Sequence, residues 1–329
     1  MPLSSQHIYD HYIAARRSSA LTVAVHLGLF DLLQTPQSFD ILQDTLALSK
    51  RGLRGLLRSL VAMDLIVEND SLFQNTAESN AFLVSTQPHY IGGLIEMDFE
   101  NFLTPTNLLQ AMREDRPTVY GDVDVWNSHQ DDREQARHFT AAMQSISIQP
   151  AEALSLLSEW QSVTHLIDMG AGSGVFGITL LQRYPQMTAS ICDLPMLETI
   201  TGEYLTEANV TDRATFVGLD MFNQSWPSGD AVLLSQILHD WNFKECQRLL
   251  KRAFSCLEPN GTIFIHEKLT NQQHKPLANA LVNLDMLIWT NGQQFSFTEL
   301  KNLLETAGFV EVTCRPTIDY WSVVTARKP

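Results

Sequence analysis

Four acidic side chains and one histidine follow five successive predicted strands in the second half of the chain: Asp168, Asp193, Asp220, His239 and Glu267. Because open α/β sheets bind ligands beyond the carboxyl ends of their strands, we expect these side chains to line one site. Asp193 lies 21 residues after Gly172, a spacing at which an acid can bind a pair of ribose hydroxyls. Polar residues at strand ends also cap helices, but five in succession favour a ligand site.

A glycine turn follows the first of these strands, within the stretch 165–177. Side chains in this turn would block the approach of a nucleotide-like ligand to the backbone at three positions, Gly170, Gly172 and Gly174. Three of the turn's glycines also match the G-x-G-x-x-G pattern of dinucleotide sites. Asp168 just before the turn would repel a pyrophosphate and suits a ligand that carries an ammonium group. The glycines alone leave a dinucleotide, another nucleoside or simple packing open.

Alternating strands and helices surround this turn, which predicts a parallel sheet with helices on both faces. After the first strand, the expected strands cover residues 188–192, 214–218, 231–236 and 262–266, and a helix over 243–257 ends before Pro259 and Gly261. Four residues separate the last two strands, 310–315 and 320–326, too few for a parallel crossover. The expected fold class is therefore α/β, with a Rossmann-like, mostly parallel sheet that ends in an antiparallel hairpin.

The first half of the chain has a winged-helix pattern. A helix is expected over 8–33, a second begins after Ser38, a third begins after Ser49, and a short hairpin spans 65–74. Arg51, Arg54 and Arg58 could face a DNA groove, but the broad apolar face of the first helix favours dimerisation. We expect a dimerisation domain over 1–95 and a catalytic domain over 96–329.

A helical bridge over 96–150 is expected to contribute to a substrate pocket. Its helices should be interrupted at Pro105, Pro117, Gly121 and Pro150. Four apolar or aromatic residues are the pocket candidates: Phe139, Met143, Met286 and Trp289. Such a lining suits a flat hydrophobic substrate.

Bulk composition limits the classes of partner. The formal net charge of −15 argues against a nucleic-acid partner, because phosphates would be repelled. The four cysteines form no C-x-x-C pair, so neither zinc nor a disulfide framework is expected. With no signal peptide and no apolar run of membrane-spanning length, we expect a cytoplasmic protein without a bound metal.

Several stretches together resemble the S-adenosylmethionine (SAM)-dependent O-methyltransferases of the plant caffeate and animal hydroxyindole type. They are Asp168-Met-Gly-Ala-Gly-Ser-Gly174, Asp193-Leu-Pro195, Asp220-Met-Phe222, Leu238-His-Asp-Trp241, Pro259-Asn-Gly261 through Glu267, Asn283-Leu-Asp-Met-Leu287 and Leu27-Gly-Leu-Phe-Asp31. The resemblance covers nearly the whole chain. It implies a class I methyltransferase domain and an N-terminal winged-helix domain that dimerises and completes the partner's pocket.

The resemblance also implies residue roles. His239 would be the general base, and Glu267 would orient it. Asp193 would bind the ribose of SAM, Gly170 and Gly172 would face its methionine part, and further residues would contact the cofactor: Asp168, Leu194, Asp220, Met221, Ser235, Gln236 and Trp241. A neutral histidine suits this chemistry, because a phenol or enol loses a proton as it attacks a sulfonium methyl.

Two positions depart from the family pattern. Gln294 stands where the family often has a second glutamate, and Ser235 replaces a common lysine near the adenine. We expect the amide of Gln294 to hydrogen-bond the histidine without adding charge. The base would then be less basic, or the substrate more acidic than a simple phenol.

Three functions stay open at this stage. The main expectation is O-methylation of a small aromatic or polyketide-like natural product. Because of Gln294, a non-methylating SAM-binding member of the fold, such as a decarboxylase or pericyclase, is a second hypothesis. A winged-helix DNA-binding regulator is a third, whereas a metal-dependent methyltransferase is disfavoured because His266-Glu267 lacks a second ligand at suitable spacing.

Overall fold

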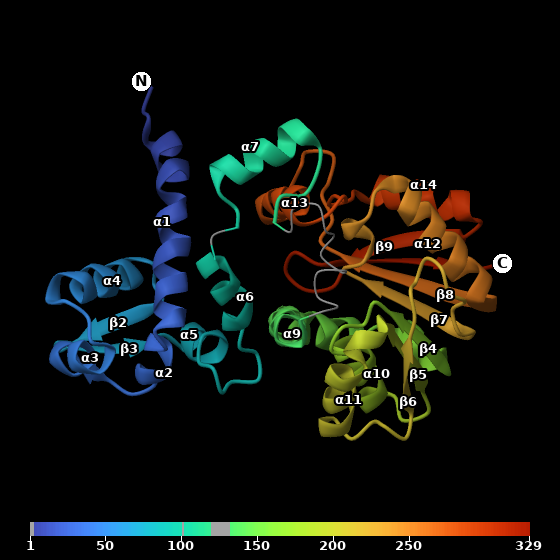
Figure 1. Cartoon of the computed structure of the whole chain (residues 1–329), viewed down its shortest axis with the longest axis horizontal. Helices are drawn as coiled ribbons and strands as arrows, with labels where there is room; N and C mark the ends of the chain where they lie inside the picture. Colours follow the sequence, from blue (N-terminus) through green and yellow to red (C-terminus); the bar gives the residue numbers. More distant parts are fainter. Residues whose placement is uncertain (1–2, 101, 120–131) are drawn as a thin grey trace. The chain divides into compact units, whose positions relative to one another are not determined.

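The computed structural model describes residues 3–100, 102–119 and 132–329 (Figure 1). The chain divides into two compact units, residues 1–101 and 102–329; the division expected from sequence lay after residue 95. No helix in the described ranges is long and apolar enough to cross a membrane.

The first unit consists of helices around a three-stranded antiparallel sheet with the order β1-β3-β2. Its elements are α1 (Gln6–His26), α2 (Leu29–Leu32), β1 (Gln37–Ser38), α3 (Phe39–Leu46), α4 (Lys50–Ala62), β2 (Ile66–Asn69), β3 (Leu72–Asn75), α5 (Ala77–Phe82), α6 (Gly92–Met97) and the 3-10 turn η1 (Asp98–Glu100). The side chains of Ser38 and Ser49 accept backbone N–H groups at the starts of α3 and α4, as their positions predict.

The single helix expected over residues 8–33 is wrong. Helix α1 ends at His26, and α2 is a separate turn, because Gly28 adopts a left-handed conformation with φ of 63°. Glycine carries little penalty in that conformation and commonly ends helices.

The second unit is a seven-stranded sheet with helices on both faces (Figure 1). Its strands are β4 (His165–Met169), β5 (Thr188–Asp193), β6 (Ala214–Gly218), β7 (Gly229–Ser235), β8 (Leu257–Glu267), β9 (Val310–Pro316) and β10 (Ser322–Arg327). Their order is β6-β5-β4-β7-β8-β10-β9. The first five strands pair in parallel, and β10 pairs antiparallel with both β8 and β9, which confirms the expected sheet and its C-terminal hairpin.

Helices and short 3-10 turns precede the first of these strands and connect the others. They are α7 (Pro105–Glu114), α9 (Arg133–Ser155), η2 (Ser158–Ser162), α10 (Val175–Arg183), η3 (Pro195–Leu197), α11 (Glu198–Glu207), η4 (Leu238–Asp240), α12 (Phe243–Cys256), α13 (Leu277–Trp289) and α14 (Phe297–Ala307).

Residues along each central strand alternate between two cores. Ile167 and Leu234 pack in one cluster with residues of α12 and α14, whereas Leu166 and Leu233 pack in the other with residues of α9 and α10. Successive strand residues point to opposite faces, so a sheet covered on both faces needs apolar residues at every position.

Among the described residues, the break expected at Pro150 is absent, because Pro150 lies inside α9. The other expected breaks are present: α7 begins at Pro105 and ends at Glu114, before Pro117, and α12 ends at Cys256, before Pro259 and Gly261, which lie within β8. Proline suits the first turn of a helix, since the N–H it lacks has no partner there. Around Pro150, buried residues such as Ala151 and Leu154 hold the helix against its neighbours, so packing outweighs the lost hydrogen bond. The break expected at Gly121 lies outside the described residues.

Candidate active site

The glycine turn between β4 and α10 holds three left-handed glycines. Gly170, Gly172 and Gly174 have φ angles of 69°, 55° and 79°. A Cβ atom on Gly170 would lie 2.3 Å from Cδ1 of Ile237, so this glycine permits close contact with the segment before η4. A Cβ atom on Gly172 would meet nothing within 4 Å, which leaves open space over the backbone at this point. The turn thus presents an accessible backbone surface beside η4.

Asp193, the last residue of β5, is bound to this turn through both carboxylate oxygens. Oδ2 accepts the N–H of Gly172 and Oδ1 accepts that of Leu194, each at 2.7 Å. The hydroxyl of Thr201 donates to the carbonyl of Gly172 at 2.7 Å, which further holds the turn. Each carboxylate oxygen keeps a second lone pair, so Asp193 can still accept hydroxyl groups of a ligand.

Asp168, on strand β4, forms a hydrogen bond with the backbone of helix α10. Its Oδ2 atom accepts the N–H of Gly177 at 2.9 Å, and only 2% of the residue is exposed. Burial raises the pKa of this carboxyl to about 7, against the opposing effect of the hydrogen bond from Gly177. Its contact with the ammonium group of a ligand stays a prediction.

Asp220, Met221 and Trp241 occupy the loops after β6 and η4. The carboxylate of Asp220 closes its own turn, because Oδ1 accepts the N–H of Phe222 at 2.8 Å. Cε of Met221 lies 3.7 Å from the position a Cβ would take on Gly170, and the rings of Phe222 and Trp241 pack edge to face at 4.6 Å. Met221 thus lies beside the glycine turn, and the packed rings of Phe222 and Trp241 supply aromatic surface next to it in the chain and after η4.

Ser235, the last residue of β7, and Gln236, which follows it, both contact His266. The hydroxyl of Ser235 lies 3.4 Å from Nδ1 of His266, and the N–H of Gln236 donates to the carbonyl of His266 at 3.0 Å. Gln236 adopts a left-handed conformation with φ of 53°, which turns the chain from the strand into η4.

His239 and Glu267 lie in contact although they are distant in the sequence. Nδ1 of His239 is 2.9 Å from Oε2 of Glu267, an ion-pair distance, although their orientation is not that of a well-formed hydrogen bond. The other carboxylate oxygen accepts the backbone N–H groups of Ile237 and Leu238, each at 3.1 Å. Glu267 therefore holds both the histidine ring and the turn that carries it.

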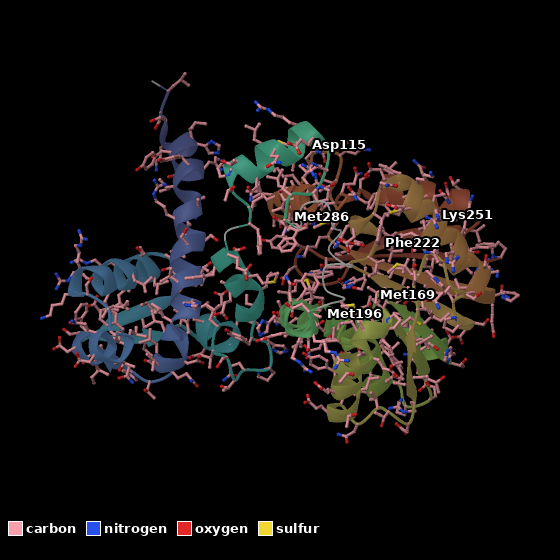
Figure 2. All side chains as sticks on the ribbon, in the orientation of Figure 1. Asp115, Met169, Met196, Phe222, Lys251 and Met286 are labelled. Atoms are coloured by element: carbon pink, nitrogen blue, oxygen red, sulfur yellow. The ribbon has the colours of Figure 1, made fainter. Side chains whose placement is uncertain are left out.

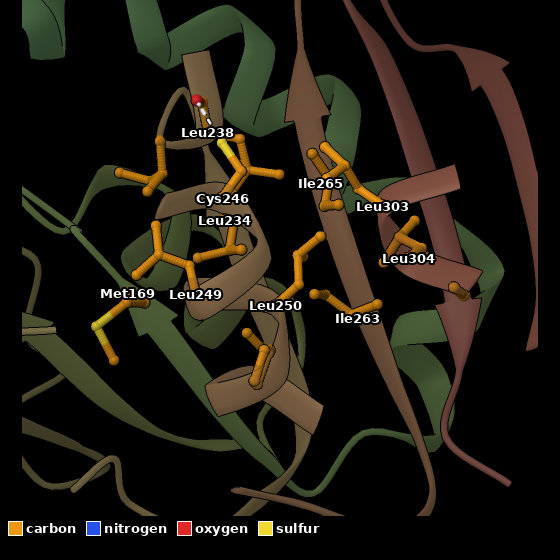
Figure 3. Packing of buried hydrophobic residues seen from close by; sticks show 14 of the residues in the cluster. Met169, Leu234, Leu238, Cys246, Leu249, Leu250, Ile263, Ile265, Leu303 and Leu304 are labelled. Atoms are coloured by element: carbon orange, nitrogen blue, oxygen red, sulfur yellow. Dashed lines mark hydrogen bonds between the residues drawn. The ribbon is translucent and has the colours of Figure 1, made fainter. Parts of the chain in front are cut away.

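Buried packing anchors this turn from below (Figure 3). Leu238 is fully buried in the core, and Sγ of Cys246 on α12 donates to its carbonyl oxygen at 3.2 Å. The backbone beside His239 is thus fixed by both hydrogen bonds and apolar contacts.

Asp240 is a second carboxylate on the histidine that the sequence analysis missed. Its Oδ1 atom lies 3.5 Å from Nε2 of His239, and only 9% of the residue is exposed. The adjacent position in Leu238-His-Asp-Trp241 was the available signal, but neighbouring residues in a chain rarely indicate which way their side chains turn.

The two carboxylates make His239 more basic, contrary to expectation. Burial alone would lower its pKa, but the charges of Glu267 and Asp240 outweigh that effect and raise the pKa to about 9. Burial raises the pKa of Asp240 to about 6. The expectation of a less basic histidine assumed that Gln294 removed the second charge, whereas Asp240 supplies one.

Gln294 does not hydrogen-bond the histidine as expected. Both amide atoms of its side chain are buried and make no hydrogen bond with any described residue. Its backbone N–H donates to Oδ1 of Asn283 at 2.7 Å. Gly292 packs so closely on the carbonyl of His239 that a Cβ atom there would lie 1.9 Å from it, so this segment lies against the backbone of the turn that carries the histidine.

The four pocket candidates come from two helices. Phe139 and Met143 lie one turn apart on α9, and both are partly buried. Met286, labelled in Figure 2, is buried on α13, where the ring of Trp289 packs edge to face on Phe102 at 4.8 Å. Their contact with a substrate stays a prediction.

Metal ligands are not clustered in the described ranges, which contain no group of three or more histidine, cysteine or acidic side chains that could hold an ion. The described site has a glycine turn and a buried histidine, His239, in contact with the carboxylate of Glu267, at the carboxyl ends of parallel strands.

This sheet order, with its antiparallel C-terminal hairpin and its site beyond β4, β5 and β7, defines a class I methyltransferase fold. The structure of human N-acetylserotonin methyltransferase in complex with SAM matches it with a TM-score of 0.89, covering 100% of this chain and 98% of that chain at 22% identity.

Comparison with known proteins identifies the family. The model of the O-methyltransferase domain matches residues 106–310, and that of the O-methyltransferase dimerisation domain matches residues 9–85. The chain belongs to this O-methyltransferase family and is a SAM-dependent enzyme. A 3-hydroxy-5-methyl-1-naphthoate 3-O-methyltransferase of Streptomyces sahachiroi is 30% identical over 90% of this chain and 87% of that protein. The acetylserotonin O-methyltransferase of Gallus gallus is 30% identical over 94% of each.

Proposed function

We propose that this enzyme methylates a hydroxyl group of a small aromatic or polyketide-like natural product, with His239 as the general base. The observation that carries the proposal is the position of His239 between Glu267 and Asp240, on a turn whose Ile237 touches the glycine turn. A proton acceptor is thereby held beside a backbone surface suited to a nucleoside.

The residues at the glycine turn fit SAM. The open space over Gly172 leaves room for a ligand, and the carboxylate of Asp193 lies against the same turn. We assign Asp193 to the ribose hydroxyls, Asp168 to the amino group, and Met221 and Trp241 to the adenine. SAM supplies an electrophilic methyl group when bound.

The contacts of the histidine ring support proton transfer at Nε2. Because Nδ1 lies 2.9 Å from the carboxylate of Glu267, we assign the ring proton to Nδ1, which leaves the lone pair of Nε2 to take the proton of the acceptor hydroxyl. The separation of 3.5 Å between Nε2 and Asp240 is too long for a strong hydrogen bond, so Asp240 leaves this lone pair available. Both carboxylates then stabilise the imidazolium that forms. No feature of the described site favours a decarboxylase, a pericyclase or a DNA-binding regulator.

The acceptor class follows from the relatives and from the lining residues. Relatives include a naphthoate methyltransferase and a tetracenomycin polyketide 8-O-methyl transferase, both of Streptomyces. Apolar and aromatic surface for such a ring system would come from the four pocket candidates, Phe139, Met143, Met286 and Trp289.

The first unit is assigned to homodimerisation. Besides the family match over residues 9–85, helix α1 exposes Ile8, Tyr9 and Tyr12, apolar surface that a second copy can cover.

We also assign the enzyme to the cytoplasm, since all four cysteines are free, and we propose no nucleic-acid or membrane partner.

Incubation with methyl-labelled SAM and a panel of hydroxylated naphthalenes, anthraquinones and indoles tests this proposal. We expect label on the oxygen of at least one acceptor. His239→Ala should lower transfer by roughly a hundredfold or more while SAM binding stays close to wild type. His138→Ala, an exposed histidine on α9, is the matched control. Unchanged turnover in His239→Ala would remove the general-base role, and absence of labelled product across the panel would count against the acceptor class.

A further inference from the structure

The side chain of Gln294 is a buried amide whose hydrogen-bonding capacity is unused. Only 5% of the residue is exposed, and neither Oε1 nor Nε2 has a partner among the described residues. Buried polar groups are nearly always hydrogen-bonded, because an unpaired one loses its water without compensation. Because Gln294 belongs to the segment that packs on the backbone of His239, we interpret this exception as a group that pairs with a ligand.

The backbone around this amide is held firmly at several points. The N–H of Gln294 donates to Asn283, and the carbonyl of Phe295 accepts from the N–H of Thr270 at 2.9 Å. Phe295 is buried in the core, and Ser296 forms a capping box with Glu299 at the start of α14. The backbone of the segment is therefore fixed, while no hydrogen bond to a described residue holds the side-chain amide of Gln294.

The segment that carries the amide packs on the turn that carries the base. Gly292 meets the backbone carbonyl of His239, and the Cα atoms of Gly292 and Gln294 are at most about 7 Å apart, because they are two residues apart in the chain. A ligand that presents its hydroxyl to His239 and extends along this segment would meet the side chain of Gln294.

We propose that Gln294 selects acceptors that carry a neutral carbonyl oxygen besides the hydroxyl to be methylated; this inference rests on the proposed function. An ionised glutamate at this position would only accept hydrogen bonds, whereas the NH₂ group of glutamine donates them. A carboxylate on the acceptor would add negative charge near Glu267 and Asp240, both of which are buried. A ketone, ester or amide oxygen can take the hydrogen bond without that repulsion.

Binding of matched acceptors to the complex with S-adenosylhomocysteine tests this selection. Each set in the panel contains a hydroxyarene ketone, its carboxylate analogue and its carbonyl-free analogue, for example 2-hydroxyanthraquinone beside 2-anthrol, in which no internal hydrogen bond joins the hydroxyl to a carbonyl. We expect calorimetry to show about tenfold tighter binding of at least one ketone over its carbonyl-free partner, as one added hydrogen bond can provide. Gln294→Met should abolish that ratio, and Gln294→Glu should abolish or reverse it. Gln293→Met, at the neighbouring amide, should leave the ratio intact.

Thermal unfolding separates this role from a structural one. Because the amide has no partner in the described protein, Gln294→Met should leave the melting temperature unchanged or raise it. A lowered melting temperature, a loss of S-adenosylhomocysteine affinity, or a panel in which no ketone binds more tightly than its partner would each overturn the inference. Ketone preference without methyl transfer would instead count against the proposed function, so the two failures are distinguishable.

Discussion

Nδ1 of His239 lies 2.9 Å from Oε2 of Glu267, and the other oxygen of the same carboxylate holds the backbone of the turn that carries the histidine. One side chain at the end of β8 thus orients both the ring and its backbone. The first prediction follows from this double contact.

Glu267→Gln should lower kcat by roughly a hundredfold, because the amide keeps the size of the side chain but removes the charge that stabilises the imidazolium. Steady-state kinetics with labelled SAM would measure this loss, and SAM affinity should change little. Glu258→Gln, at an exposed position of the same strand, is the matched control. Wild-type turnover in Glu267→Gln would show that the contact does not assist proton transfer.

The pH dependence of kcat/KM should report the raised pKa of His239. The base must be neutral to accept a proton, so kcat/KM should rise with pH and level off above about 9. Asp240→Asn removes one of the charges that raise this pKa and should move the profile to lower pH by about one unit. NMR titration of the His239 ring would check the assignment, with Asp44→Asn as an exposed control. A midpoint near 6.5 in the wild type would contradict the prediction.

Gly170→Ala and Gly172→Ala should differ in their effects. Both residues are left-handed, a conformation that costs a non-glycine residue about 1–2 kcal/mol. The new Cβ of Gly170→Ala would also overlap with Ile237, so this variant should lose more unfolding free energy in urea titrations. The methyl group of Gly172→Ala enters open space, so that variant should fold but bind S-adenosylhomocysteine weakly by calorimetry. If the two variants lost the same unfolding free energy and Gly172→Ala bound S-adenosylhomocysteine as the wild type does, the separate roles given to Gly170 and Gly172 would be wrong.

His266 should destabilise the fold in mild acid. Burial lowers its pKa to about 3 in the folded protein, while the unfolded value is near 6.5. The contribution of the neutral His266 ring to the free energy of unfolding is therefore fully present above pH 6.5. It declines as the pH falls toward 3, by up to about 1.4 kcal/mol per pH unit.

Urea titrations between pH 7 and 4.5 would measure this slope for His266. His266→Gln should reduce the slope of unfolding free energy against pH by the amount that corresponds to the uptake of about one proton on unfolding. His138→Gln, at an exposed position, should leave the slope unchanged. If His266→Gln leaves the slope as steep as in the wild type, another group is responsible.

Local sequence patterns predicted much of the architecture of the second unit. Apolar runs, turn residues and the short link expected between the last two strands predicted a mostly parallel sheet with an antiparallel hairpin, and the structure has both. They failed where packing overrides local preference, as at Pro150 within α9, because a proline tolerated by its surroundings looks the same in sequence as one that ends a helix.

By itself, the sequence determined the order of the elements, the glycine turn and the presence of His239 and Glu267 at the ends of neighbouring strands. These depend on residue types and short spacings, which a linear chain displays directly. Only the tertiary structure decided which charges surround the histidine, because Asp240 turns back toward Nε2 while Gln294 does not reach it. The direction of these side chains and the charges around the histidine depend on atoms that folding brings together from η4, β8 and the segment after α13.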